Sequence, residues 1–197
     1  MKNQNSKTTK LLKLKNMRKS IINIAAIIVL TLTSQLSIAQ TSESSTKLAQ
    51  ESKDVLAEMI KKAPSLESYY NQSYGYAVFP KVTKGAISVG VAAGKGVVYK
   101  NHKIVSASKL KQLTVGFQFG GQQYSEIIFF QNEEAFEQFM NMKMKFDGQV
   151  SAVALRAGAS ADISYSYGAA VFTQAIGGLM FEASIGGQHF TNKPISN

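Results

Sequence analysis

The sequence predicts one α+β domain with a curved or barrel-like antiparallel sheet, an N-terminal amphipathic helix and a second helix near residues 132–145. Two observations predict this class. All 15 glycines lie between Gly75 and Gly187, so a glycine-free, helical beginning precedes a glycine-rich body. Within that body, short β-branched and aromatic runs are separated by glycine and other turn residues, a pattern typical of antiparallel strands.

The first 39 residues have the layout of a secretory signal peptide. Basic residues and no acidic residue begin the chain, an apolar run follows from Ile21 to Leu32, and small residues end at Ala39. That run is shorter than the roughly 20 residues of a membrane-spanning helix, which disfavours an uncleaved anchor. We therefore expect a signal peptide over residues 1–39 and an exported domain, periplasmic or secreted, over residues 40–197.

The charge of the chain is unevenly distributed. The formal net charge is +10, but seven basic residues precede residue 40, which leaves 10 − 7 = +3 for the expected mature domain. This small value, together with export, argues against a nucleic-acid partner. Between Glu67 and Glu126 there is no acidic residue, while seven lysines lie there: Lys81, Lys84, Lys95, Lys100, Lys103, Lys109 and Lys111. These are either solvated turn and edge residues or a surface for anionic head groups.

The mature domain begins with a predicted amphipathic helix that Pro64 ends. Its apolar face consists of residues at helical spacing: Leu48, Ala49, Val55, Leu56, Met59, Ile60 and Ala63. The opposite face is nearly balanced, with four lysines, Lys53, Lys61 and Lys62 among them, and three acids. Two interpretations stay open: the apolar face docks on the sheet as core, or it lies in a membrane interface.

The glycine-rich body predicts short successive strands. We expect them at residues 76–79, 86–91, 96–99, 104–107, 113–119, 124–130, 150–155, 163–172 and 179–185, with a tight bend at residues 90–96. Paired glycines at 120–121, 177–178 and 186–187 indicate strongly bent strands. Asn132 caps the second helix, two acids follow it, Phe136, Phe139 and Met140 form its buried face, and Lys143 and Lys145 lie near its end.

Motifs for catalysis or cofactor binding are lacking. With no cysteine and only His102 and His189, the chain has neither a zinc site of the usual nitrogen and sulfur type nor a cysteine nucleophile. The glycines before Lys95 have the wrong spacing for a phosphate loop. We expect no cofactor and no enzymatic activity; a catalytic role would require a close pair among carboxylates such as Asp147, Asp162 and Glu182.

Three segments of the body carry a family resemblance. They are Tyr74-Gly75-Tyr76-Ala77-Val78-Phe79-Pro80-Lys81-Val82-Thr83-Lys84-Gly85, Gly94-Lys95-Gly96-Val97-Val98-Tyr99, and the glycine-rich run from Gly177 to Gly187. Together they resemble the SYLF domain, also described as the yeast actin-regulator family, over residues 47–190. The resemblance implies phospholipid binding with help from an amphipathic helix at the start of the domain. The tryptophan common in the family is absent, because the chain contains no tryptophan.

We therefore expect an exported domain that binds anionic phospholipid at a membrane surface through a localised basic region and an amphipathic helix. The candidate contacts are the apolar helix residues Leu48, Val55, Leu56, Met59 and Ile60 and the lysines Lys53, Lys61, Lys62, Lys81, Lys84, Lys95 and Lys100. The alternative is a non-enzymatic structural or adaptor protein of the cell envelope that binds a protein partner.

Overall fold

A computed structural model describes residues 43–144, 146, 152–155, 163–178 and 187–195 of the chain, without the side chains of 86–89 and 114–120. The expected signal peptide lies outside these residues. The part that carries the site is one compact unit, Lys47–Asn197. Within it the described residues form three helical segments and a five-stranded sheet, as the α+β expectation requires.

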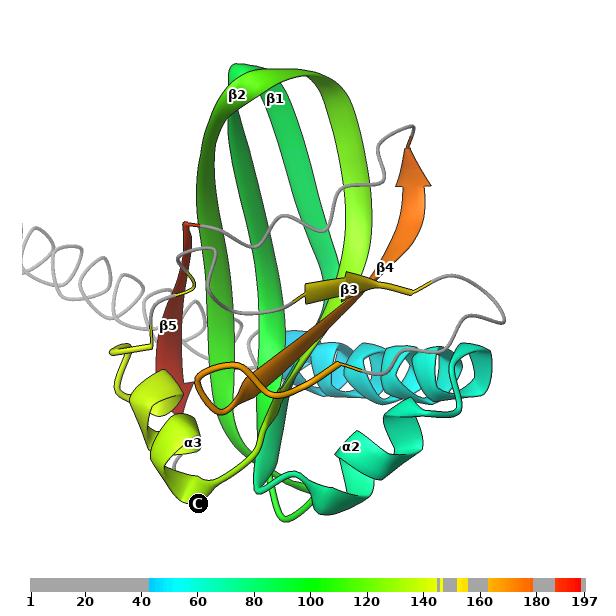
Figure 1. Ribbon diagram of the computed structural model, residues 1–197, viewed down its shortest axis with the longest axis vertical. Helices are drawn as coiled ribbons and strands as arrows, with labels where there is room; N and C mark the ends of the chain where they lie inside the picture. Colours follow the sequence, from blue (N-terminus) through cyan, green and yellow to red (C-terminus); the bar gives the residue numbers. More distant parts are fainter. Residues whose placement is uncertain (1–42, 145, 147–151, 156–162, 179–186, 196–197) are drawn as a thin grey trace, which may run out of the picture. The chain divides into compact units, whose positions relative to one another are not determined.

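One long hairpin dominates the sheet (Figure 1). Strand β1, Gly75–Lys100, pairs antiparallel with strand β2, Lys103–Phe130. Asn101 and His102 join them with φ angles of 50° and 61°, as in the mirror-image turns that suit the twist of two-residue hairpins. The prediction of six short strands here was wrong. Register shifts at residues 79–82, 87–89 and 98–99 bend the strands without ending them.

Strand β1 comes close to itself because the hairpin is folded over, as the ribbon in Figure 1 shows. A Cβ atom on Gly94 would lie 3.1 Å from the carbonyl oxygen of Lys81, and one on Gly96 would lie 2.6 Å from that of Val78. Only glycine permits this approach of the two halves. The predicted tight bend at residues 90–96 was therefore wrong, since this segment lies within β1, whereas the predicted curvature of the sheet is confirmed.

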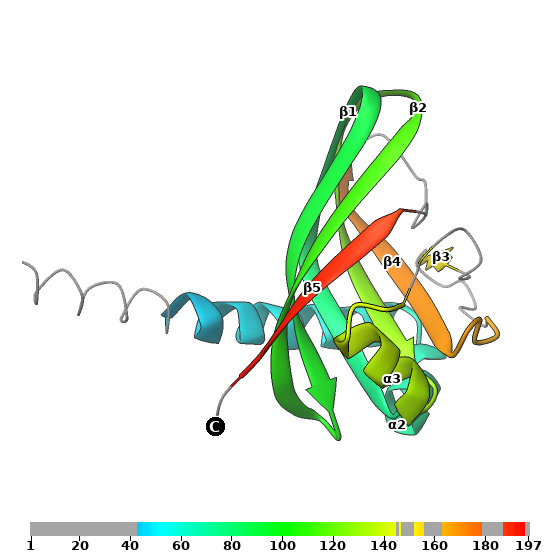
Figure 2. The same cartoon turned by 90° about the vertical axis from the view of Figure 1, so that its left-hand side faces the viewer.

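The remaining strands flank different halves of the hairpin (Figure 2). Strand β4, Ala169–Gly178, pairs antiparallel with the second half of β2, and β3, Ala152–Ala154, lies parallel to β4. Strand β5, Gln188–Pro194, which we did not predict, pairs with residues 106–112 of β2. The expected strand at 163–172 begins later because Tyr167 and Gly168, with φ of 52° and 74°, form a turn. The run at 179–185 lies outside the described residues.

The helices differ from the prediction at their ends. The first helix covers residues 43–62, and an unpredicted short helix, α2, Leu66–Gln72, follows Pro64 and buries Leu66 and Tyr69. Helix α3, Glu133–Met140, begins at Asn132, whose side chain accepts a hydrogen bond from the backbone N–H of Ala135 at 2.9 Å.

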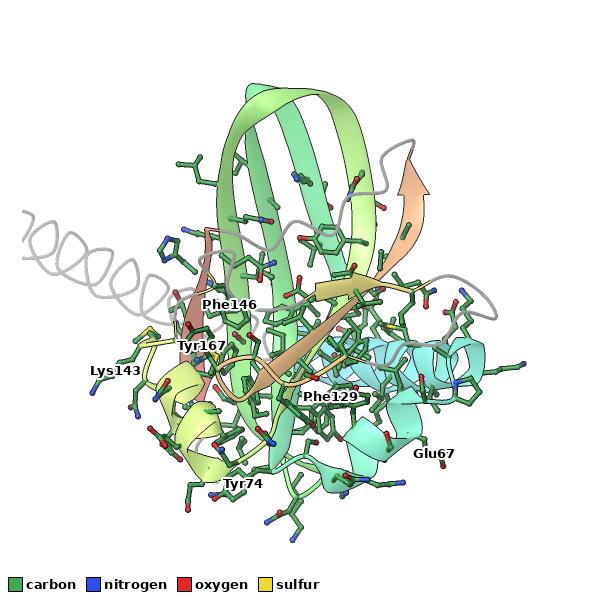
Figure 3. All side chains as sticks on the ribbon, in the orientation of Figure 1. Glu67, Tyr74, Phe129, Lys143, Phe146 and Tyr167 are labelled. Atoms are coloured by element: carbon green, nitrogen blue, oxygen red, sulfur yellow. The ribbon has the colours of Figure 1, made fainter. Side chains whose placement is uncertain are left out.

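Helix α3 ends at Met140 because Met142 adopts a positive φ of 58° and reverses the chain. The expectation of a helix up to residue 145 was therefore wrong. Lys143 lies three residues beyond the last residue of α3 and is exposed (Figure 3), so the last turn of the helix contains no basic residue. Lys145 lies outside the described residues.

Two hydrophobic clusters cover the two faces of the hairpin. Alternate residues of β2 point in opposite directions: Ile127 and Phe129 pack with the first helix and α2, while Ile128 and Phe130 pack with α3 and β5. The ring of Phe129, labelled in Figure 3, lies 5.9 Å from that of Tyr69 in α2. The first helix therefore supplies one of the two layers that make the sheet stable.

Candidate functional site

A pocket of about 480 Å³ opens where the start of the first helix meets the outward face of the folded hairpin. This volume lies in the range of ordinary ligand pockets. Four lysines and a single carboxylate line it, together with apolar groups and backbone: Leu48, Glu51, Pro80, Lys81, Thr83, Ala93, Gly94, Lys95, Lys109, Leu110 and Lys111.

Strand alternation and folding of the hairpin bring the four lysines together. Lys81, Lys95, Lys109 and Lys111 are exposed, whereas their neighbours Val82, Gly96, Leu110 and Gln112 are buried. Lys109 and Lys111 therefore share one face of β2. Lys81 joins that face from the other half of β1, because Gly94 lets the two halves approach.

The pocket holds positive charge without a matching negative charge. Lys95 and Lys109 are directly opposite in the β1–β2 register, an arrangement in which Cβ atoms are about 5 Å apart and like charges destabilise the pair. None of the three ion pairs among the described residues includes a pocket lysine. An anion in the pocket would relieve this repulsion.

Glu51, the one carboxylate at the pocket, has a partner of its own on the first helix. The Lys47 Nζ atom lies 4.0 Å from Glu51 Oε1, and the two side chains are 77% and 50% exposed. Such an exposed pair contributes little stability, but it partly offsets the charge of Glu51. The pocket is therefore positive on balance.

The other pocket residues give it an apolar part. Leu48 of the first helix, Pro80 and Ala93 of β1 and Leu110 of β2 line it beside the lysines. A ligand that combines a negative head with an apolar part meets both surfaces at once. The arrangement is suited to an anionic amphiphile.

Part of this pocket was predicted from the sequence. Leu48, Lys81 and Lys95 were candidates, and the structure brings them together. Lys109 and Lys111 were seen in the acid-free stretch but not chosen, although their i, i+2 spacing places them on one face of a strand. Glu51 and Thr83 were missed, since neither carries a recognisable motif.

Two candidate lysines lie away from the pocket. Lys84 is opposite Gln122 on the inner face of the hairpin and is only 3% exposed. The Nζ atom of Lys100 lies 4.8 Å from the centre of the Tyr74 ring and 3.8 Å from Glu133 Oε1. The Tyr74 side chain, and then the charge of Glu133, raise the pKa of Lys100. Lys100 therefore contacts the region around α3.

The helix candidates divide between the core and the surface. Met59 is fully buried and Leu56 is 8% exposed, while Val55 and Ile60 pack partly buried against the same cluster. In this conformation the apolar face docks on the sheet, so lipid contact by these four residues stays a prediction. Lys53 and Lys61 are exposed; Lys62 donates a 2.5 Å hydrogen bond to Glu58, which lowers the pKa of Glu58.

The rest of the described structure offers few other sites. Among the described residues no three His, Cys, Asp or Glu side chains gather as metal ligands. No helix in that part of the chain has the length and apolar character needed to cross a membrane. A smaller pocket of about 250 Å³ lies at the start of α3, between Asn132 and Tyr167, and contains no lysine.

The fold and the pocket define a domain that presents a basic, partly apolar surface on a folded-over antiparallel hairpin. The sequence model of the Ysc84 family, described as Las17-binding protein actin regulator, matches residues 111–197. This match agrees with the resemblance to the SYLF family over the C-terminal part of the chain.

A curated protein is similar to a larger part of the chain. The chain is 26% identical over 137 residues to Beta cell expansion factor A of Aeromonas veronii. The match covers 68% of this chain and 52% of the relative, so the chain spans about half of that protein's length.

Proposed function

We propose that this domain binds anionic phospholipid at the lysine-lined pocket, as a non-enzymatic protein that acts outside the cytoplasm. The observation that carries the proposal is the convergence of Lys81, Lys95, Lys109 and Lys111 around an apolar pocket with no ion-pair partner among the described residues. Phosphate groups of lipids supply the missing negative charge, and lipid carbon supplies contacts for Leu48 and Pro80.

The signal-like segment supports action outside the cytoplasm, and the family resemblance supports lipid binding without catalysis. A basic start, a short apolar run and small residues before Gln40 favour export. SYLF proteins as a family bind lipid, and no catalytic motif was found in the sequence. An exported member meets lipid at membrane surfaces of the envelope or beyond it.

Vesicle flotation with matched lysine variants tests the proposal. The variant Lys81→Gln, Lys109→Gln, Lys111→Gln should bind vesicles of phosphatidylcholine and phosphatidylglycerol about a hundredfold less tightly, since each of the three lysines contributes about 1 kcal/mol near an anionic bilayer. The control Lys103→Gln, Lys143→Gln, Lys193→Gln removes the same charge from three exposed positions that do not line the pocket.

The two variants separate site-specific binding from general attraction. We expect the control to retain most binding, and raised salt to weaken the native chain. Chains starting at Met1 and at Gln40 are compared, because the basic first segment adds its own attraction to anionic vesicles. Equal losses in the pocket and control variants contradict a role for the pocket. Retention of a stoichiometric protein and no lipid supports the adaptor alternative.

A further inference from the structure

The folded end of the hairpin carries an exposed apolar pair beyond the pocket. Val91 of β1 and Leu113 of β2 are 56% and 59% exposed and are directly opposite each other in the β1–β2 register. The described structure contains other exposed large apolar side chains, namely Met142, Tyr167, Ile176 and Ile195, but none of these is paired across two strands with another. The Val91–Leu113 pair is therefore a distinct feature of the surface.

This pair continues the face on which the pocket lysines lie. Along β1 the outward residues are Val91, Ala93 and Lys95, and opposite them on β2 are Leu113, Lys111 and Lys109. Two residues of a strand span about 7 Å. Lys111, the first lysine along this face, therefore lies about 7 Å from the Val91–Leu113 pair, and the Lys95–Lys109 pair lies about 14 Å from it. Along this face, the apolar pair is followed by the pocket lysines and then by the first helix.

We propose that Val91 and Leu113 form a wedge that enters the acyl region of an anionic bilayer while the pocket lysines hold the head groups. This proposal rests on the lipid binding proposed above and adds the orientation of the domain on the membrane. An interface that is negative at the head groups and apolar beneath them complements both parts of this face. The hairpin itself contributes no carboxylate to this face, because the chain has no acidic residue between Glu67 and Glu126, and Glu51 of the first helix is paired with Lys47.

Charge favours a lipid surface over a second copy of the chain as the occupant. Two copies that joined through this face would bring Lys95, Lys109 and Lys111 of one copy near the same lysines of the other. The apolar pair alone is small compared with the area that a stable dimer buries. A bilayer removes the apolar pair from water and neutralises the lysines in one step.

A single tryptophan tests the depth of insertion, because the chain contains none. The full chain with Leu113→Trp is mixed with vesicles of phosphatidylcholine and phosphatidylglycerol, with or without brominated acyl chains that quench indole fluorescence. The matched control is Ile195→Trp, since Ile195 is 49% exposed and its N–H donates to the carbonyl of Val105, toward the other end of β2. We expect a blue shift and at least threefold stronger quenching with Leu113→Trp than with Ile195→Trp.

The other possible results separate failure of the wedge from failure of lipid binding. Vesicle binding with equal or no quenching at both positions overturns the wedge and leaves lipid binding intact. Absence of vesicle binding by the native chain overturns both proposals. If the Leu113→Trp chain does not fold, as judged by circular dichroism, Val91→Trp replaces it. As a second measurement, Val91→Ser with Leu113→Ser should weaken vesicle binding about tenfold relative to Met142→Ser with Ile195→Ser, and equal effects overturn the wedge.

Discussion

Glu126 is a fully buried carboxylate on the inner face of the hairpin. Its Oε2 atom accepts a 2.8 Å hydrogen bond from Gln188 Nε2, while Oε1 has no partner among the described residues. Burial raises the pKa of Glu126 to about 7, and the hydrogen bond from Gln188 only partly opposes this. The folded state therefore binds a proton that the unfolded chain releases near pH 4.5.

This pKa predicts how stability depends on pH. The pKa of Glu126 is higher in the folded state than in the unfolded chain. Its contribution to the free energy of unfolding is therefore complete below about pH 4.5 and is lost as pH rises to about 7. Glu126→Gln should remove that loss and raise the free energy of unfolding by up to about 3 kcal/mol at pH 8, with little effect at pH 4. Urea unfolding across this range measures the difference.

An exposed glutamate provides the control for this measurement. Glu134 lies on the surface of α3, and Glu134→Gln should change the free energy of unfolding by no more than about 0.5 kcal/mol. Parallel stability curves for the native chain and Glu126→Gln would show that the carboxylate is ionised at little cost, contrary to its burial.

At the scale of elements, the first helix is core in this conformation, and this gives a second stability prediction. Met59→Ala should lower the free energy of unfolding by about 2–4 kcal/mol, because Met59 is fully buried and its truncation leaves a cavity. Lys53→Ala on the opposite, exposed face should change it by no more than about 0.5 kcal/mol. Denaturant titration compares them.

The size of the Met59 effect decides between the two interpretations of the helix. If Met59→Ala lowers the free energy of unfolding as little as Lys53→Ala does, the helix contributes little to the core. That result would favour the interpretation in which the helix lies in a membrane interface. A large cost means that membrane contact by Leu56 or Met59 requires the helix to leave the sheet, and lipid must then compensate for the lost packing.

Whether a segment forms a helix or a strand was predicted from the sequence better than where that helix or strand ends. Hydrophobic periodicity located the first helix, and Asn132 located the start of α3, because both signals are local. Strand lengths depended on bulges and on the approach of Gly94 to Lys81, which are tertiary features. Glycines that appeared to end strands instead allowed two long strands to fold over.

The candidate site, too, was predicted where the signal is local and missed where it depends on tertiary structure. The acid-free lysine stretch was visible as charge, and Lys81 and Lys95 were chosen from it. Lys84 has the same charge, but strand alternation turns it to the inner face, where it is 3% exposed. Lys109 became part of the site only because the folded hairpin brings it near Lys81. Such convergence depends on long-range packing.

At the scale of the whole molecule, the net charge of +10 separates into parts with different meanings. Seven of the charges belong to the expected signal peptide, and seven lysines lie in the acid-free stretch between Glu67 and Glu126. Folding divides the second group further, because four of its members line the pocket while Lys84 and Lys100 lie elsewhere. The function we propose depends on this local concentration of charge and not on the total.

Titration of the isotopically labelled chain with a short-chain phosphatidylglycerol, followed by amide NMR, shows which residues contact the lipid. If the pocket binds the lipid, the largest shifts occur around Lys81, Ala93, Lys95 and Lys109–Lys111, and the shifts weaken when salt is raised. A matched short-chain phosphatidylcholine should give smaller shifts because it lacks net charge. Shifts confined to α3 or to the smaller pocket near Tyr167 would contradict the account.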